Sequence, residues 1–77
     1  MIPRIQVLAP NLTAVQTVRG TIWFSYETPI AFNAGSGIVA CTNYWSNTTG
    51  KHINRVAGNA PRLNKTDFDK SIKEAFA

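Results

Sequence analysis

The sequence predicts an α+β fold: an antiparallel meander of four to five strands followed by one short helix and a C-terminal amphipathic helix packed on the sheet. Residues 4–43 alternate apolar and polar side chains in short runs separated by Gly, Pro and Asn, which is typical of strands and hairpins. After Trp45, apolar side chains recur at spacings of three and four, and capping residues flank these segments, as in helices.

Length and composition limit the class of protein. The 77 residues accommodate one domain, assigned to residues 1–77, with the meander at 4–43, a short helix or loop at 46–57 and the last helix at 67–76. A hydrophobic content of 44% with only 16% charged residues argues against disorder. The net charge is +4, which favours an anionic partner.

Three features of the sequence bear on the expected cellular location of the protein. The longest apolar run, residues 37–41, is too short to span a bilayer, so we expect no membrane association. Pro and Arg residues interrupt the first twenty positions, so no signal peptide is expected. Cys41 is the only cysteine, which excludes an internal disulfide framework and a multi-cysteine zinc site. We therefore expect a cytoplasmic protein.

The first half of the meander contains three expected strands. The first is Arg4–Leu8 and the second is Thr13–Val18. Arg19-Gly20 supplies the next turn, because Gly adopts positive φ without strain. Thr21–Tyr26 has the strongest strand propensity in the chain. Both faces of this strand carry an aromatic side chain, which indicates a central strand covered at least partly on both sides.

The second half of the meander begins at a proline. Because Pro29 lacks an N–H donor, Glu27–Pro29 is expected to be a turn or a strand break. Ile30–Asn33 then resumes the strand, and Ala34–Gly37 closes a second hairpin. Ile38–Asn43 is the last expected strand.

A short helix is expected at Asn47–Ala57. Ser46 is a good N-cap and Gly58 a good C-terminal residue. At 100° per residue, the residues fall on two arcs of the helix. The apolar arc contains Trp45, Thr49, Ile53 and Val56, and the polar arc contains Thr48, Lys51, His52 and Arg55. Gly50 and its two threonine neighbours are poor helix formers, so an extended loop is the alternative.

The C-terminal helix is expected to begin after Thr66 as N-cap and to run from Asp67 to about Phe76. Its apolar side chains recur at spacings of three and four, which predicts that one face docks on the sheet. On the solvent side, Lys70 and Glu74 have the spacing of an ion pair.

The sequence offers little catalytic chemistry. A Cys41–His52 dyad is disfavoured because Cys41 lies within an apolar strand, where free cysteines are usually buried. His52 has no second histidine and no carboxylate within one helical turn, so we expect no metal site. Thr49-Gly50-Lys51-His52 lacks the first glycine of a phosphate loop, which excludes a nucleotide hydrolase of that kind. We expect neither an enzyme nor a cofactor.

The remaining candidate is a basic patch on the segment 46–57. Hydroxyl, amide and cationic groups together suit phosphate oxygens or an acidic protein surface. Lys51, His52 and Arg55 would neutralise phosphate, and Thr48 and Thr49 would donate hydrogen bonds. Trp45 or Tyr44 would stack on unpaired bases, with Trp23 and Tyr26 as further candidates.

The alternative is that the polar arc is only the solvated side of an amphipathic helix. A small domain also needs its large apolar groups for its core, so we expect core positions for five aromatic residues: Trp23, Phe24, Phe32, Phe68 and Phe76.

Two sequence blocks carry a resemblance. Phe24-Ser25-Tyr26-Glu27-Thr28-Pro29-Ile30-Ala31-Phe32 and Trp45-Ser46-Asn47-Thr48-Thr49-Gly50-Lys51-His52-Ile53-Asn54 resemble a family of small bacteriophage-encoded proteins with a domain of unknown function. The resemblance covers roughly residues 20–57. It implies a phage setting, and hence the cytoplasm of an infected bacterium, but no mechanism.

We therefore expect a small non-catalytic binding module for an anionic ligand, nucleic acid or a nucleotide. The alternatives are a phage inhibitor that masks a host enzyme or defence protein, and a minor virion or assembly component. Because so small a domain buries little apolar surface, a homodimer joined through a sheet edge or the helices is also expected.

Overall fold

The computed structural model describes residues 4–77. The elements follow in the order β1 (Arg4–Ala9), β2 (Leu12–Thr17), β3 (Gly20–Ser25), β4 (Thr28–Asn33), β5 (Ile38–Cys41), α1 (Asn47–Ala57), β6 (Arg62–Leu63) and α2 (Lys65–Ala75). The strands form one sheet in chain order, antiparallel throughout except for the parallel pair β5–β6. The α+β class and the meander are confirmed, but the described sheet has six strands.

The β3–β4 turn differs from the expected one. The turn residues are Tyr26 and Glu27, so the expected turn or strand break at Glu27–Pro29 is correct for Glu27. It is wrong for Pro29, which lies inside β4 opposite Phe24. The register between β3 and β4 shifts at this point, and such irregular positions tolerate a residue without an N–H donor. The β2–β3 turn consists of residues 18–19, one residue before the expected Arg19-Gly20, and Gly20, the first residue of β3, has φ of 145°. A Cβ there would collide with the carbonyl oxygen of Asn33.

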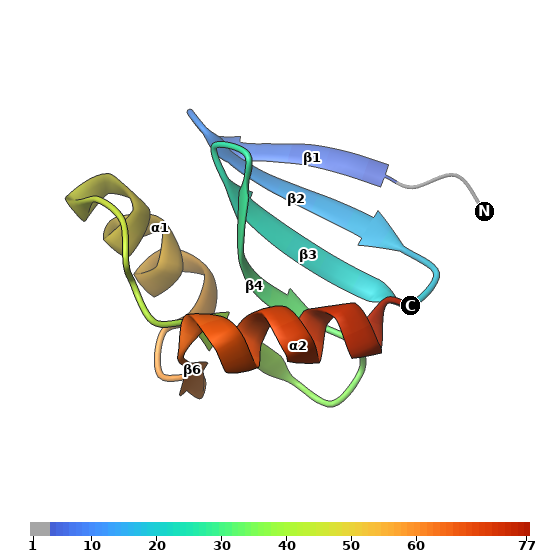
Figure 1. Ribbon diagram of the computed structural model, residues 1–77. Helices are drawn as coiled ribbons and strands as arrows, with labels where there is room; N and C mark the ends of the chain where they lie inside the picture. Colours follow the sequence, from blue (N-terminus) through green and yellow to red (C-terminus); the bar gives the residue numbers. More distant parts are fainter. Residues whose placement is uncertain (1–3) are drawn as a thin grey trace.

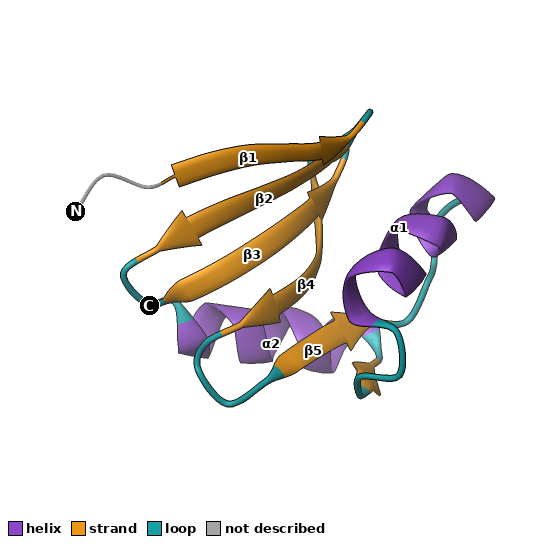
Figure 2. Ribbon diagram, turned by 180° about the vertical axis from the view of Figure 1, so that it is seen from behind, coloured by secondary structure: helices purple, strands orange, loops and turns teal. Residues whose placement is uncertain are grey.

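The two helices lie on opposite faces of the sheet (Figures 1 and 2). Along β5, Ile38 and Ala40 belong to the core under α1, whereas Val39 and Cys41 belong to the core under α2. On β3, Trp23 packs against the α1 core and Ile22 against the α2 core. The prediction that this strand is covered on both sides is therefore confirmed.

Each core has its own set of buried side chains. The α1 core consists of Leu12, Ile30, Ala31, Ala40, Ile53 and Ala57. The α2 core consists of Phe32, Cys41 and Phe68, with Ile72 and Phe76 packed against it. Of the five aromatic residues expected in the core, Phe32 and Phe68 are buried, whereas the other three are half-buried.

One of the two helices has the bounds expected from the sequence, and the other begins earlier than expected. The helix expected at Asn47–Ala57 is confirmed with the same bounds, and the alternative loop is not formed. The C-terminal helix begins at Lys65, two residues earlier than expected, because Asn64 caps it: its Oδ1 accepts from the Asp67 amide at 2.8 Å. Within α2 the ion pair joins Lys65 and Asp69, at 3.2 Å.

Among the described residues, no helix is long and apolar enough to cross a membrane.

Candidate basic and aromatic surface on the first helix

Helix α1 is fixed at both ends by local hydrogen bonds. Ser46 Oγ accepts from the Thr49 amide at 3.2 Å, and the Gly58 amide donates to the Asn54 carbonyl at 2.9 Å. Gly58 has φ of 53°, a conformation that favours glycine. These caps fix where α1 begins and ends.

The inner side of α1 carries a buried polar cluster. Ser25 Oγ, on β3, lies 2.8 Å from His52 Nδ1 and 3.0 Å from Thr49 Oγ1. Ser25 is only 1% exposed, and Thr49 and His52 are also buried. Thr49 and His52 therefore form buried hydrogen bonds with Ser25 on the sheet. They do not lie beside Lys51 on an exposed patch.

The three side chains share few protons. The Ser25 hydroxyl has one proton, which it donates either to His52 Nδ1 or to Thr49 Oγ1, and the other partner then donates to Ser25 Oγ. Ser46 Oγ in turn donates to Thr49 Oγ1 at 3.4 Å. This arrangement ties the first two turns of α1 to the centre of the sheet.

The expected division of α1 into an apolar and a polar arc was wrong for His52, which is buried on the inner side of the helix. His52 follows Thr49 by three residues and precedes Val56 by four, which is the spacing of one helix side. Its polarity suggested the outer arc, whereas its spacing indicates the inner one. Ser25, the missed member of the cluster, shares a strand face with Trp23, and a polar residue there signals a buried partner.

The outer side of α1 keeps three of the predicted residues. Thr48, Lys51 and Arg55 are exposed. Arg55 Nη2 donates to the Leu8 carbonyl at 3.2 Å, which holds the guanidinium over the end of β1. Arg62, which no sequence pattern indicated, adds a cation beside the last turn of α1. Its Nη2 donates to Asn54 Oδ1 at 3.0 Å.

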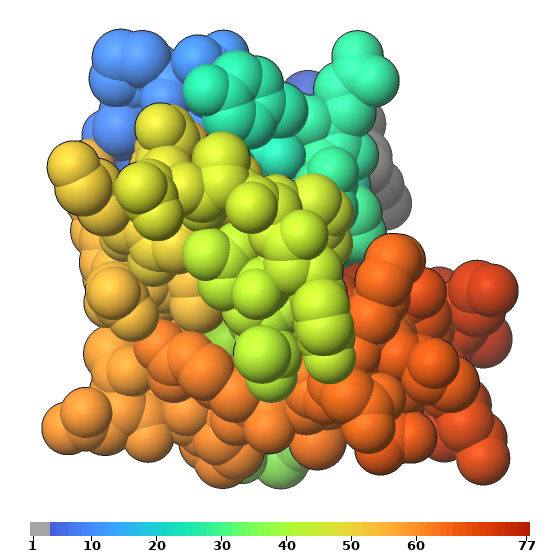
Figure 3. Space-filling view, turned by 60° about the vertical axis from the view of Figure 1, so that its left-hand side comes forward, coloured from blue at the N-terminus to red at the C-terminus, as the bar shows by residue number. Residues whose placement is uncertain are grey.

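Two aromatic side chains precede α1. Tyr44 and Trp45 are 55% and 37% exposed, and their rings meet edge to face with centroids 6.3 Å apart. Asn43 fixes this segment, because its Oδ1 accepts from the Trp45 amide and its Nδ2 donates to the Ser46 carbonyl. We call the exposed set Tyr44, Trp45, Thr48, Lys51 and Arg55 the α1 surface; the yellow-green to yellow part of the chain covers the middle and upper left of the face in Figure 3.

Charge is distributed unevenly between the helices. Helix α1 carries Lys51 and Arg55 and no carboxylate. Helix α2 carries three lysines and three carboxylates, so its charges cancel. The fourth carboxylate of the chain, Glu27, is in the β3–β4 turn. Of the two helices, only α1 therefore carries excess positive charge.

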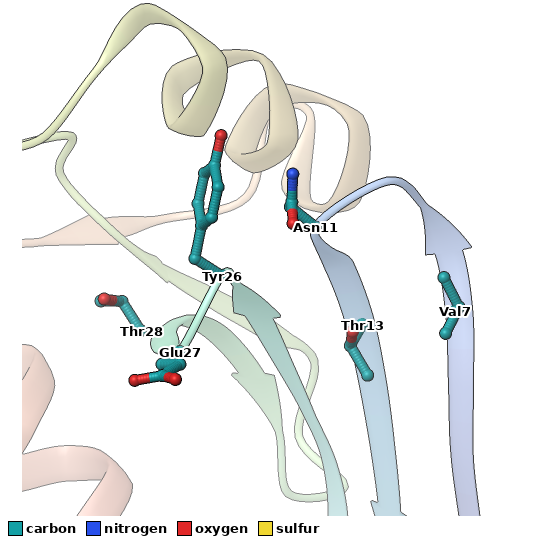
Figure 4. Close-up of a pocket in the computed structure, with 6 residues that line it drawn as sticks. All are labelled: Val7, Asn11, Thr13, Tyr26, Glu27 and Thr28. Carbon is teal, nitrogen blue, oxygen red and sulfur yellow. The ribbon is translucent and has the colours of Figure 1, made fainter.

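A separate open pocket lies near the β3–β4 turn (Figure 4). Its lining residues are Val7, Asn11, Thr13, Tyr26, Glu27 and Thr28. They include a carboxylate and no cation, so this pocket does not suit an anion. Asn11 and Tyr26 both have positive φ, 64° and 58°, and the Tyr26 amide donates to the Asn11 carbonyl at 2.7 Å. This bond holds the two turns together beside the pocket.

The structure also separates the groups considered for catalysis. Cys41 lies in the α2 core and His52 under α1, on the other face of the sheet, so they do not form a dyad. Burial, the largest cause, and then the carboxylate of Asp69 raise the pKa of the Cys41 thiol, which disfavours the reactive thiolate. Within residues 4–77, no three His, Cys, Asp or Glu side chains gather as metal ligands.

Comparison with known proteins gives one match. The model of a family described as Family of unknown function (DUF8033) matches residues 5–74. This span is wider than the two blocks that suggested a resemblance, and the family description names neither a phage nor an activity. No curated protein and no solved structure matches the chain.

Proposed function

Because the chain belongs to Family of unknown function (DUF8033), we propose its function from its geometry: it is a non-catalytic module that binds single-stranded nucleic acid through the α1 surface. One observation carries the proposal. Exposed cations lie on a helix that has no carboxylate, and an exposed aromatic pair directly precedes the N-terminus of that helix. Cations that follow a phosphate backbone, with aromatic rings that stack on bases, are the usual means of binding single strands.

Each side chain has a distinct role in this proposal. Lys51 and Arg55, one helical turn apart, contact neighbouring phosphates, and Thr48 donates a hydrogen bond. Trp45 and Tyr44 stack on unpaired bases beside the N-terminus of α1. Thr49 and His52 orient the helix through Ser25 and take no part in contacting the ligand.

Fluorescence anisotropy of labelled single- and double-stranded DNA and RNA tests the proposal. For two phosphate contacts on a single strand, affinity falls about sevenfold between about 50 and 200 mM salt. Lys51→Ala/Arg55→Ala should remove most of this salt dependence and weaken binding, while the melting temperature changes little. Trp45→Ala should weaken binding by about 1–3 kcal/mol, the contribution of one stacked base.

The matched control is Lys70→Ala/Lys73→Ala on α2. It removes the same charge from the opposite face of the sheet and should leave binding nearly unchanged. Equal weakening by both double variants would mean that net charge alone attracts the ligand. Absence of binding at the lower salt would refute the nucleic-acid proposal and leave an acidic protein, such as a phage-targeted host enzyme, as the candidate partner of this surface.

A further inference from the structure

The two edges of the sheet are built differently. The β6 edge consists of two residues and leads directly into α2. The β1 edge is a six-residue strand that pairs with β2 on one side and with no described strand on the other. Figure 1 shows β1 at the far side of the sheet from α2. Only β1 therefore presents a full row of backbone donors and acceptors for another strand.

The first part of the β1 edge carries few of the features that normally prevent strands from pairing. β1 contains no proline, lysine or carboxylate, and its register with β2 is regular from Arg4 to Val7 and shifts only between Val7 and Ala9. Ile5 and Val7 point to the α2 side of the sheet and are 69% and 72% exposed. Helix α2 packs on β5 and β6 and on Phe32 of β4, and it does not cover Ile5 and Val7. Figure 4 shows Val7 on β1 beside Thr13 on β2.

We infer that the β1 edge pairs with β1 of a second copy, antiparallel and centred on Gln6. This register places Ile5 of each copy opposite Val7 of its partner, so four exposed apolar side chains meet on one face. It also uses the stretch of β1 that lies clear of Pro10. A strand centred half a residue away would place Gln6 opposite Val7 and mix polar with apolar side chains.

Charge permits this pairing despite the net charge of +4. Arg4 is the only charged residue of β1. In this register the two Arg4 residues are offset by four residues along the strands, about 13 Å. That distance exceeds the Debye length of about 8 Å at physiological salt, so their repulsion is largely screened.

The dimer has a defined arrangement of helices. The twofold axis of two antiparallel identical strands is perpendicular to the sheet, so both α1 surfaces lie on one side and both α2 helices on the other. Helix α1 sits over β3–β5, so the two copies are about seven strand spacings apart, roughly 34 Å before twist. The inference does not depend on the proposed function, because its test measures association rather than ligand binding.

Sedimentation equilibrium of the full chain tests the inference with a charge exchange. The wild type should be a dimer. Ile5→Lys/Val7→Lys and Ile5→Glu/Val7→Glu should each be monomers, because like charges face each other in either homodimer. Their equimolar mixture should restore a dimer. Both positions are exposed, so the substitutions leave the cores intact, and circular dichroism checks that each variant is folded.

Val18→Lys is the matched control. Val18 is 80% exposed and lies in the β2–β3 turn, so the added charge should leave the dimer unchanged. Gln6→Cys tests the register, because directly opposed residues have a Cα separation of about 4.5–5.5 Å, within the range that a disulfide joins. A monomeric wild type, or a mixture that stays monomeric while both variants are folded, would overturn the inference.

Discussion

The two helices of this protein have the same length of 11 residues and cover opposite faces of one sheet, but they are attached in different ways. Helix α2 docks mainly through Phe68, which meets Phe32 with ring centroids 5.6 Å apart. Helix α1 docks through Ile53 and, beside it, through the hydrogen bonds of Thr49 and His52 to Ser25.

This difference explains why only α1 offers a defined charged surface. Apolar contacts resist separation but tolerate small rotations, whereas hydrogen bonds are directional and fix which side of a helix faces outward. The polar cluster therefore fixes the outward orientation of Lys51 and Thr48. On α2, whose charges cancel in number, Lys65 and Asp69 form an ion pair with each other.

Removing the apolar attachment of α2 should have the largest effect. Phe68→Ala deletes a ring that is only 1% exposed and should destabilise the fold by about 3–5 kcal/mol, a large part of the stability of a small domain. Urea denaturation followed by circular dichroism measures this loss. Phe68→Leu should stay folded and lose about 1–1.5 kcal/mol, and exposed Lys70→Ala should change little. A loss under 1 kcal/mol for Phe68→Ala would mean that α2 contributes little to the fold.

Removing the polar attachment of α1 should have an intermediate effect. Ser25→Ala leaves Thr49 Oγ1 and His52 Nδ1 without their shared buried partner and should cost about 1–3 kcal/mol. Chemical denaturation gives the free energy, and Thr48→Ala on the exposed side of the same helix is the control. If Ser25→Ala matched that control, the polar cluster would not be what attaches α1.

The meander could be predicted from sequence because its signals are local. Alternating side chains, separated by Gly, Pro and Asn residues, indicate the strands β1 to β5, and the caps Ser46 and Gly58 directly beside the helix indicate α1. Strand β6 has only Arg62 and Leu63, too few residues for any periodicity. It exists because β5 offers pairing groups: the Ala40 amide donates to the Pro61 carbonyl, and the Thr42 amide to that of Leu63.

The candidate site could be predicted only in part. The exposed positions of Thr48, Lys51 and Arg55 follow from helical spacing once α1 is assigned. The spacing of His52 from Thr49 and Val56 indicates its inward position, but the partner that satisfies it there, Ser25, is 27 residues away and cannot be paired with it from local sequence. Pro29 was misjudged for a related reason, since its tolerance depends on the register between β3 and β4.

The buried thiol under α2 should make stability depend on alkaline pH. Burial raises the pKa of Cys41 above the usual value of 9.0, whereas the unfolded chain keeps that value. Stability is therefore unaffected below about pH 9 and falls as the pH rises toward the folded pKa, because the unfolded state releases the proton first. The difference in unfolding free energy between wild type and Cys41→Ala, measured from pH 7 to 10.5, isolates this contribution. A difference that stays constant over that range would contradict it.

The smallest effect should distinguish two roles of Gly50 in α1. Alanine improves helix propensity by up to about 1 kcal/mol, but its Cβ would lie 2.8 Å from Asn43 Nδ2. That amide group donates to the Ser46 carbonyl and fixes the segment that carries Tyr44 and Trp45. Gly50→Ala should therefore gain nothing, or lose a few tenths of a kcal/mol, in the wild type.

In an Asn43→Ala background the obstruction is gone, so Gly50→Ala should now stabilise α1 by up to about 1 kcal/mol. Thermal denaturation of the four chains gives the coupling between the two positions. An equal gain in stability in both backgrounds would show that glycine at position 50 is not needed to make room for the Asn43 side chain. A change of sign would show instead that α1 contains a poor helix former because the aromatic segment must pack against its first turns. Helix α2 has no such segment before it and does not have this constraint.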